Sequence, residues 1–312
     1  MRFGLQIPNF TYDVPDAELF ERVADHATAA EESGFSSVWV MDHFFQLPPL
    51  GGPDQPMLEG YTLLGALAAR TEQVQLGTLV TGVTYRNPAM LAKIVTTLDV
   101  ISRGRAILGI GAAWYDTEHE ALGFDFPPVK ERMDRLEDAV QICRAMFTAD
   151  PAGFDGRHHS IRDARNLPRP IREGGIPIMI GGGGEKRTLR LVAQYADACN
   201  IAGDLDTVRH KIDVLQRHCA DVGRDPAEIA VTRMSTLMLT DSPDQTAETR
   251  QFLADAAGPE AAAGFTVGQG DEVAAEVKAF AAAGVDELIF NMPLADVDTV
   301  RRAGALLSAS AG

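Results

Sequence analysis

One stretch of the chain reads Ile178-Met179-Ile180-Gly181-Gly182-Gly183-Gly184-Glu185-Lys186-Arg187-Thr188. It begins with a short apolar run of the kind that forms buried strands. The four glycines that follow permit a tight turn, and the polar residues after them are typical of the start of a helix. The stretch therefore predicts one βα unit, and a chain of such units folds into a parallel sheet.

The same alternation of strand and helix extends along the chain in both directions. Apolar runs predict strands at residues 2–8, 37–41, 74–80, 105–110, 176–180, 198–201, 229–239 and 286–291. Helical periodicity predicts helices at residues 16–33, 61–70, 88–102, 129–147, 185–195, 205–222, 271–283 and 294–307. This α/β pattern favours a closed (β/α)8 TIM barrel, and an open doubly wound sheet is the alternative.

Two segments interrupt the alternation. Residues 148–173 are rich in Gly, Pro, Arg and Asp, and they predict an insertion before the fifth strand, at about residues 148–175, that lies over one end of the fold. Residues 241–268 are polar and rich in alanine, and they predict a helix followed by a mobile loop. Because a barrel of this kind commonly forms one unit of about 250 residues, we expect a single domain over residues 1–312.

The composition excludes several classes of function. The formal net charge is −16, which argues against a nucleic-acid partner. No apolar run approaches the roughly 18 residues of a membrane span, and the opening strand leaves no room for a signal peptide. We therefore expect a cytoplasmic protein without membrane contact. The cysteines Cys143, Cys199 and Cys219 lack metal-binding spacing and predict buried free thiols.

The glycine turn, Gly181–Gly184, has the properties of a phosphate site. Glycines let the backbone approach an anion closely and direct several N–H groups at it, and the following helix adds the positive end of its dipole. Lys186 and Arg187 would supply local positive charge in an otherwise acidic chain. The alternative is a flexible turn whose glycines only relieve crowding. The turn follows the fifth predicted strand, whereas barrels commonly bind phosphate after the last two.

Active sites of barrels lie at the C-terminal ends of the strands, and two of these ends carry distinctive residues. Asp42 and His43 follow the second strand, and an imidazole there can move a proton near neutral pH. Thr81-Gly82-Val83 follow the third strand, where a glycine indicates a bulge or a close backbone approach. An ordinary loop histidine and an ordinary βα turn are the alternatives.

Two further strand ends give weaker indications. Gly109-Ile110-Gly111-Ala112-Ala113-Trp114-Tyr115 combines glycines that would leave space for a ligand with aromatic residues that line a pocket or only pack in a loop. Asn200, after the sixth strand, offers a hydrogen-bonding amide. The sequence has no metal-binding cluster and no hydrolase nucleophile motif. A phosphate site without these groups is typical of a protein whose chemistry is supplied by an organic cofactor.

These motifs together resemble the bacterial-luciferase-like family of flavin- and deazaflavin-dependent monooxygenases and reductases. The resemblance rests on Arg2-Phe3-Gly4-Leu5, Trp39-Val40-Met41-Asp42-His43, the block from Leu76-Gly77-Thr78 to Pro88, Leu98-Asp99-x-x-Ser102-x-Gly104-Arg105, Leu108-Gly109-Ile110-Gly111-Ala112 and Ile180-Gly181-Gly182-Gly183-Gly184-Glu185-Lys186. It covers nearly the whole chain and weakens across residues 241–268.

The resemblance implies a TIM barrel with an insertion before the fifth strand, a homodimer and a small-molecule substrate. One branch of the family uses reduced FMN and oxygen, and another uses coenzyme F420 for hydride transfer. Asp42-His43 and Thr81-Gly82-Val83 resemble the F420 branch more closely. We therefore expect an F420-dependent oxidoreductase, with an FMN-dependent monooxygenase as the alternative. A non-catalytic flavin-binding protein and an unrelated phosphate-binding barrel are the remaining hypotheses.

The resemblance also implies roles for single residues. His43 would lie by the deazaflavin ring and take part in proton transfer. Gly82–Val83 would form a bulge with a non-proline cis peptide behind the ring. The expected cofactor contacts are Asp42, His43, Thr81, Gly82, Val83, Gly111, Ala112, Gly181, Gly182, Gly183, Gly184, Glu185 and Lys186. Ala112 and Ala113 stand where some F420 dehydrogenases of the family carry a catalytic glutamate, which leaves the substrate open.

Overall fold

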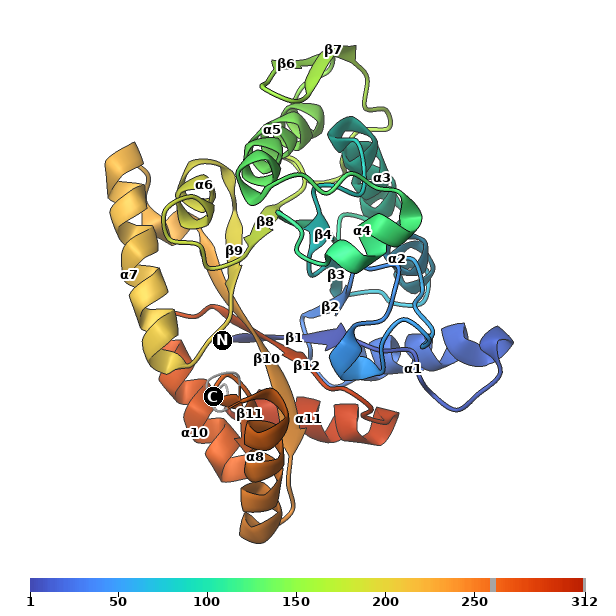
Figure 1. Ribbon diagram of the computed structural model, residues 1–312, viewed down its shortest axis with the longest axis vertical. Helices are drawn as coiled ribbons and strands as arrows, with labels where there is room; N and C mark the ends of the chain where they lie inside the picture. The colour runs from blue at the N-terminus through green and yellow to red at the C-terminus, as the bar shows by residue number, and fades with distance from the viewer. Residues whose placement is uncertain (259–261, 311–312) are drawn as a thin grey trace.

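The computed structural model of the protein describes residues 1–258 and 262–310. Within them, a closed parallel barrel is formed by β1 (Arg2–Ile7), β2 (Ser37–Val40), β3 (Gln75–Thr78), β5 (Ala106–Gly111), β8 (Ile178–Gly181), β9 (Ala198–Ile201), β10 (Ala230–Leu239) and β12 (Glu287–Asn291). The strands pair in this order, and β12 returns to pair with β1 (Figure 1). The predicted (β/α)8 barrel is confirmed, and each predicted strand overlaps one of these.

Helices connect the strands as predicted. They are α1 (Leu19–Glu32), α2 (Gly60–Ala68), α3 (Pro88–Ile101), α5 (Val129–Thr148), α6 (Thr188–Tyr195), α7 (Leu205–Val222), α10 (Gly270–Ala282) and α11 (Val297–Ser310). Their ends follow local chemistry. For example, the Asn87 side chain accepts hydrogen bonds from the first amides of α3, whose first residue is Pro88. Asp204 caps α7 in the same way, and Gly223 ends it in the left-handed conformation.

Smaller elements complete the fold. They are η1 (Asp16–Glu18), η2 (Pro48–Leu50), η3 (Pro226–Glu228), β4 (Thr81–Gly82), which pairs with β5, α4 (Asp116–Leu122), α8 (Pro243–Ala257) and β11 (Thr266–Gly268), which pairs with β10. The helix predicted within residues 241–268 is α8. The mobile loop predicted after it includes residues 259–261, which lie outside the described residues. No helix of the described chain combines the length and the apolar composition that a bilayer crossing requires.

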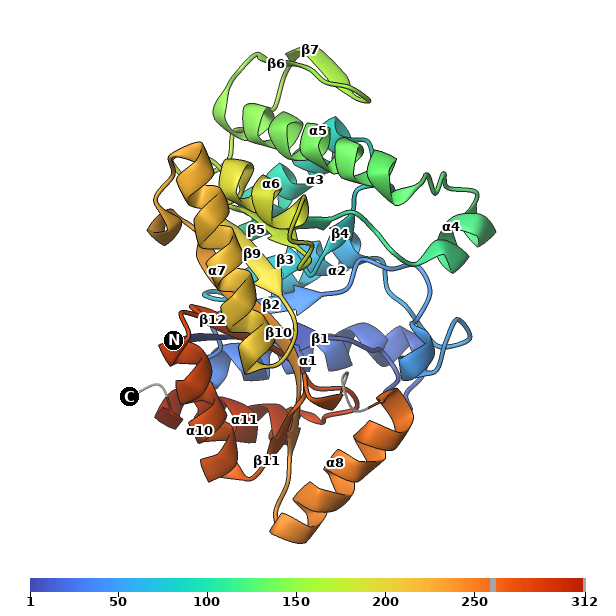
Figure 2. The same cartoon turned by 60° about the vertical axis from the view of Figure 1, so that its left-hand side comes forward.

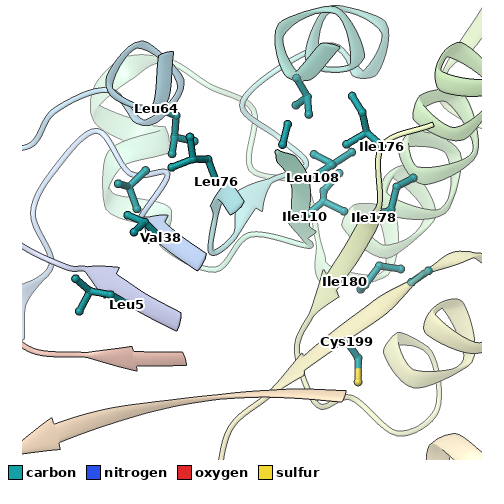
Figure 3. Packing of buried hydrophobic residues seen from close by; sticks show 14 of the residues in the cluster. Leu5, Val38, Leu64, Leu76, Leu108, Ile110, Ile176, Ile178, Ile180 and Cys199 are labelled. Atoms are coloured by element: carbon teal, nitrogen blue, oxygen red, sulfur yellow. The ribbon is translucent and has the colours of Figure 1, made fainter. Parts of the chain in front are cut away.

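The core has two layers because side chains of a strand point alternately to opposite faces. Val38, Leu76, Leu108, Ile110, Ile178 and Ile180 point outward and pack with buried helix residues such as Leu64 (Figure 3). A second cluster joins Trp39, Leu79, Met179 and Ile289, which belong to the barrel interior. The outer layer attaches the helices, and the inner layer fills the barrel below the strand ends.

Inward-facing glycines make room for two bulky side chains in the barrel. A Cβ atom on Gly77 would lie 2.7 Å from the Trp39 ring. A Cβ atom on Gly111 or on Gly181 would lie 2.9 Å from a methyl group of Val80. Both distances are far below van der Waals contact. Val80 thus occupies the space beside Gly111 that the sequence assigned to a ligand.

The insertion differs in part from its prediction. The strands β6 (Ala152–Asp155) and β7 (Ser160–Ala164) form a hairpin on the outer side of α5, away from the barrel strands (Figures 1 and 2). The Asp138 carboxylate of α5 accepts hydrogen bonds from the amides at the hairpin turn. The chain then passes the C-terminal ends of α5 and α3, where Arg169 donates to Phe147 O. Only this return segment lies at one end of the barrel, opposite to the glycine turn.

Candidate active site

The glycine turn lies where β8 ends and α6 begins. Gly182 has φ +118°, a conformation that favours glycine, and its amide donates to Asn200 O on β9. A Cβ atom on Gly184 would lie 2.8 Å from Thr188 Oγ1. Within the described residues, the amides of Gly183, Gly184 and Glu185 have no intramolecular acceptor. The turn therefore presents free amide donors at a helix N-terminus, which is the donor set that binds phosphate.

Positive charge reaches this turn from an unexpected element. Lys211 of α7 forms an ion pair with Glu185 at 2.5 Å, and its Cε would lie 3.7 Å from a Cβ atom on Gly183. The pKa of Glu185 is lowered chiefly by this hydrogen bond. Arg187 instead forms an ion pair with Asp134 of α5 at 2.6 Å. The prediction that Arg187 charges the turn is therefore corrected, because Asp134 holds its guanidinium. Lys186 is exposed, and its role at the turn stays a prediction.

His43, directly after β2, is held by a buried carboxylate. Its Nδ1 donates to Glu118 Oε1 at 2.8 Å, which fixes the imidazole orientation. Glu118 lies in α4, is fully buried, and also accepts from the amide of Phe44 at 2.7 Å. No described residue forms a hydrogen bond with Nε2. The geometry leaves Nε2 of His43 as the nitrogen that can exchange a proton with a ligand.

Tyr85 contributes a further hydrogen bond to Glu118, and Gly82 explains how it fits. The phenol O–H donates to Glu118 Oε1. A Cβ atom on Gly82 would lie 2.6 Å from the Tyr85 ring, so the glycine is required for the ring to pack there. Burial raises the pKa of a carboxyl, but hydrogen bonds from His43, Tyr85 and the Phe44 amide outweigh it and hold the pKa of Glu118 below its usual range. Glu118 is therefore ionised at neutral pH.

Asp42 belongs to a separate network that supports the His43 loop. Its carboxylate is 1% exposed and accepts two hydrogen bonds from Arg86, at 2.6 and 3.0 Å. Thr81 donates to the same carboxylate at 2.8 Å, and Glu59 accepts from Arg86 at 2.5 Å. The Arg86 guanidinium also lies 4.8 Å from the centre of the Tyr61 ring. These contacts tie the loops after β2 and β4 together beneath His43.

The cis peptide lies elsewhere than predicted. The structure has it between Leu79 and Val80, where β3 ends before β4, and the bond between Gly82 and Val83 is trans. The expected location was therefore wrong by three residues. Val80 is half-buried, and its side chain lies over the glycines that end β5 and β8. The inner surface between the His43 loop and the glycine turn is thus formed by a valine.

The structure separates the predicted cofactor contacts into two groups. Asp42, Thr81, Gly82, Val83 and Gly111 are buried, so they support the loops and do not face solvent. His43 is 9% exposed, and the residues at the strand ends that are half-buried or exposed are Ala112, Gly181, Gly182, Gly183, Gly184, Glu185 and Lys186. Trp114 and Tyr115 lie with ring centres 5.7 and 5.8 Å from that of His43. Asn200 supports the turn through its carbonyl oxygen.

Sequence reasoning missed four residues of the site. Glu118, Tyr85, Arg86 and Lys211 were assigned no role. Glu118 lies in the short helix α4, which was not predicted, and a buried glutamate has no local signature that separates it from an exposed one. Arg86 and Tyr85 lie in the loop after β4. Two large polar side chains close to a glycine at a strand end could have indicated that this loop contributes to the site.

The arrangement fits an anionic organic cofactor that spans the strand ends. The free amides of the glycine turn and Lys211 would hold a phosphate, and Val80 would support a planar ring between the turn and His43. Among the described residues, no group of three or more His, Cys, Asp or Glu side chains is placed to hold a metal ion. The site therefore offers proton transfer at His43 next to a surface for a ring system.

Comparison with known proteins gives one family. The sequence model of the luciferase-like monooxygenase family matches residues 1–287. The chain is 31% identical over 300 residues to the F420-dependent glucose-6-phosphate dehydrogenase of Kineococcus radiotolerans, which covers 87% of both chains. It is 37% identical over 175 residues to the enzyme of the same name from Amycolatopsis mediterranei, where the match spans 56% of this chain and 50% of that enzyme.

A solved structure shows the same fold. An F420-dependent secondary alcohol dehydrogenase in complex with an F420–acetone adduct superposes with a TM-score of 0.80. It shares 21% identity, and the alignment covers 99% of this chain and 97% of that one. The family model matches most of the sequence, and the Kineococcus enzyme is similar over 87% of both chains. The chain belongs to the luciferase-like monooxygenase family.

Proposed function

We propose that the protein is an F420-dependent oxidoreductase that transfers a hydride between the cofactor and a small organic substrate. The relatives named as F420-dependent enzymes support this assignment. The observation that carries it is the His43–Glu118 pair, placed at the same end of the barrel as a glycine turn with free amides. A proton-transfer group and an anion site at one barrel end are what such a reaction requires.

When bound, coenzyme F420 supplies a deazaflavin ring whose C5 gives or takes a hydride. His43 Nε2 exchanges the proton that accompanies this transfer. Glu118 keeps the Nδ1 proton in place and stabilises the imidazolium that forms. The amides of Gly183 and Gly184 and the Lys211 ammonium hold the phosphate end.

The proposal is tested by titrating the purified protein with oxidised and reduced F420 and with FMN, with absorbance and fluorescence as readouts. We expect F420 to bind and FMN to bind more weakly. Tight FMN binding without F420 binding would overturn the choice of cofactor. Failure to bind either cofactor would remove the whole assignment and favour an unrelated phosphate-binding barrel.

An FMN-dependent monooxygenase is the second candidate function, and the description of the matching family as luciferase-like monooxygenase favours it. It predicts oxygen consumption when reduced FMN and substrate are supplied together. The F420 proposal predicts hydride transfer at an unchanged rate without oxygen. Turnover under an inert atmosphere therefore distinguishes the two reactions. A non-catalytic flavin-binding protein would show neither.

We further propose a cytoplasmic homodimer. Large apolar side chains are exposed at Ile101 of α3 and at Ile171, and a methyl group of Ile171 lies near Gly104, three residues after Ile101. Contact with a second subunit would remove these two side chains from water, which favours association. Light scattering on the purified protein should give twice the chain mass of 33.5 kDa. A monomer at all concentrations would contradict the proposed dimer.

A further inference from the structure

The loops at the C-terminal ends of the barrel strands are nearly devoid of positive charge. The loops after β1, β2, β5, β9, β10 and β12 contain no lysine or arginine before the next helix. The short helix α4 and the residues that join it to α5 also contain none. Cations in these loops are confined to Arg86, after β4, and to Lys186 and Arg187, after β8.

Two of these three cations are already paired. Arg86 contacts two carboxylates, those of Asp42 and Glu59, and its side chain is 9% exposed. Arg187 is held by Asp134 at 2.6 Å. Lys186 lies at the glycine turn, where Lys211 of α7 also approaches. Within these loops, positive charge is therefore concentrated at the glycine turn. Lys130 and Arg132 lie just beyond them, in the first turn of α5, where Lys130 pairs with Asp134 and Arg132 lies over the Phe126 ring.

Negative charge, by contrast, is distributed over the same loops and α4. Its carriers are Asp13, Asp42, Asp54, Glu59, Asp116, Glu118, Glu120, Asp125, Glu185, Asp204, Asp241 and Asp296. Four of them are in ion pairs, Asp42 and Glu59 with Arg86, Glu185 with Lys211 and Asp241 with Arg302, and the other eight form no ion pair with a lysine or arginine of the described residues. The chain as a whole carries −16, so no distant excess of cations offsets these groups. Summed charges of one sign around a site repel ligands of that sign and lower their local concentration.

The surface beside His43 suits an uncharged ligand. Trp114 is 62% exposed, its ring centre is 5.7 Å from that of His43, and the Tyr115 ring lies behind it. Exposed aromatic faces bind apolar and hydroxyl-bearing molecules and give no compensation for an anion. A phosphate placed here would find neither an unpaired guanidinium nor an ammonium among the described loop residues.

We infer that the substrate of this site is an uncharged organic molecule, and that anionic substrates such as sugar phosphates are excluded. This inference rests on the proposed function, in which the glycine turn takes the cofactor phosphate. It separates the protein from its relatives named as glucose-6-phosphate dehydrogenases. The positive charge at the glycine turn then binds the cofactor phosphate, and the negative charge at the other strand ends repels an anionic substrate.

The two tryptophans allow a direct test. Trp39 is 1% exposed, so Trp114 alone is open to quenchers in solution. We would quench its fluorescence with iodide, caesium and acrylamide and determine the quenching constant for each. Each constant is divided by the constant that the same quencher gives with free N-acetyltryptophanamide. At low salt we expect the normalised iodide constant to be at least about twofold below the acrylamide constant, and the gap to shrink at high salt. An iodide constant equal to or above that of acrylamide would overturn the inference.

A pair of variants locates the effect. Asp116→Asn with Glu120→Gln removes two exposed acidic groups next to Trp114, and it should raise iodide quenching. Asp221→Asn with Glu173→Gln removes two exposed acidic groups at the opposite end of the barrel, and it should leave iodide quenching unchanged. An equal rise in both variants, or no rise in either, would contradict a local field at the site. Circular dichroism of both variants checks their folding.

Turnover supplies the second readout. Once F420 binding has been shown by titration, glucose 6-phosphate is added to the loaded protein and the absorbance of oxidised F420 is followed. We expect no reduction above the rate without substrate. Reduction by glucose 6-phosphate would overturn the inference while leaving the proposed function intact. Failure of F420 to bind would remove the proposed function, and the quenching result, which needs no cofactor, would still measure the charge at the site.

Discussion

The two sides of the candidate site are built in opposite ways. Around His43, the carboxylates of Asp42 and Glu118 are buried and each accepts several hydrogen bonds, as Glu118 does from an imidazole, a phenol and backbone amides. At the glycine turn, the backbone is half-buried or exposed, and the amides of Gly183, Gly184 and Glu185 have no intramolecular acceptor within the described residues. The charges there lie on long side chains such as Lys211. One side is held rigidly by the protein, and the other requires a ligand to satisfy its donors.

This difference reflects two physical demands. Proton transfer needs a group within hydrogen-bond distance of one atom, so the imidazole must be fixed by partners that do not move. Phosphate binding needs several donors and net positive charge, and it tolerates an exposed site because the anion itself completes the hydrogen bonds. The buried side should therefore respond to mutation through turnover and stability, and the exposed side through affinity and salt.

The largest effect is expected at the rigid side. His43→Ala removes the proton-transfer group, and turnover with F420 should fall by about 100-fold or more. The dissociation constant for F420 should change little. The thermal unfolding midpoint should fall less than for Glu118→Ala, because Glu118 keeps its hydrogen bonds from Tyr85 and the Phe44 amide. Unchanged turnover would exclude His43 from the mechanism.

Glu118→Ala removes the carboxylate that holds His43 in place. It leaves His43, Tyr85 and two amides without their buried acceptor, and the free energy of unfolding should fall by about 3 kcal/mol. Because the pKa of Glu118 is lowered in the folded state, its stabilisation is present above the unfolded pKa of about 4.3 and is lost as the pH falls through the lower folded value. Urea unfolding at several pH values measures both effects.

Glu118→Gln is the matched control. It keeps the shape and one acceptor oxygen but removes the charge, so the loss of stability should be smaller than for alanine and the acid-dependent part should disappear. Turnover should still fall by about 10-fold, because the imidazolium loses its carboxylate. A glutamine variant with full activity would show that Glu118 only supports packing.

At the glycine turn, smaller effects on affinity are expected. Lys211→Ala should weaken F420 binding by about fivefold at low salt and by less at high salt, as for an exposed ion pair. Lys186→Ala should act in the same direction. Glu185→Gln should strengthen binding because it releases Lys211 from its carboxylate. Lys278→Ala, on α10, is the control and should leave the dissociation constant unchanged, whereas an equal loss there would indicate a general charge effect.

The smallest effect concerns the strand beneath the turn. Cys199, on β9, pairs with Ile180 in the sheet and is buried, and burial raises its pKa to about 12. Cys143 is raised to about 12 by the same cause. We expect neither thiol to react with Ellman's reagent in the native protein and both to react after unfolding in urea. Reaction of Cys199 in the native state would show that solvent reaches β9, the strand beside the glycine turn.

Much of the fold could be predicted from the sequence because its signals are local. Strands and helices follow from the spacing of apolar residues, and the run of glycines marks the turn at the end of β8. Cys143, Cys199 and Cys219 are free and buried, as their context in apolar runs indicated. The hairpin of the insertion was not predicted, because β6 and β7 are short and polar and gain their order from Asp138 of α5.

The candidate site was only half predictable, for a physical reason. His43 and the glycine turn could be found because each lies directly at a strand end, a position that the sequence reveals. The contact between His43 and Glu118 joins residues 75 positions apart, and that between Lys211 and Glu185 joins residues 26 apart on different elements. The spacing of apolar residues along the chain does not indicate such pairs, since they form only when the barrel closes.

Local patterns of polarity and glycine specify elements and turns, so they were enough to predict the barrel, its family and the two strand ends of the candidate site. Which groups are buried together follows instead from the packing of the folded chain. In the folded chain, Glu118 is hydrogen-bonded to His43, Arg86 is paired with Asp42, and Lys211 lies at the glycine turn. Val80 occupies the space left by Gly111 and Gly181. Burial and hydrogen bonding depend on neighbours from distant segments, and these neighbours are set by packing.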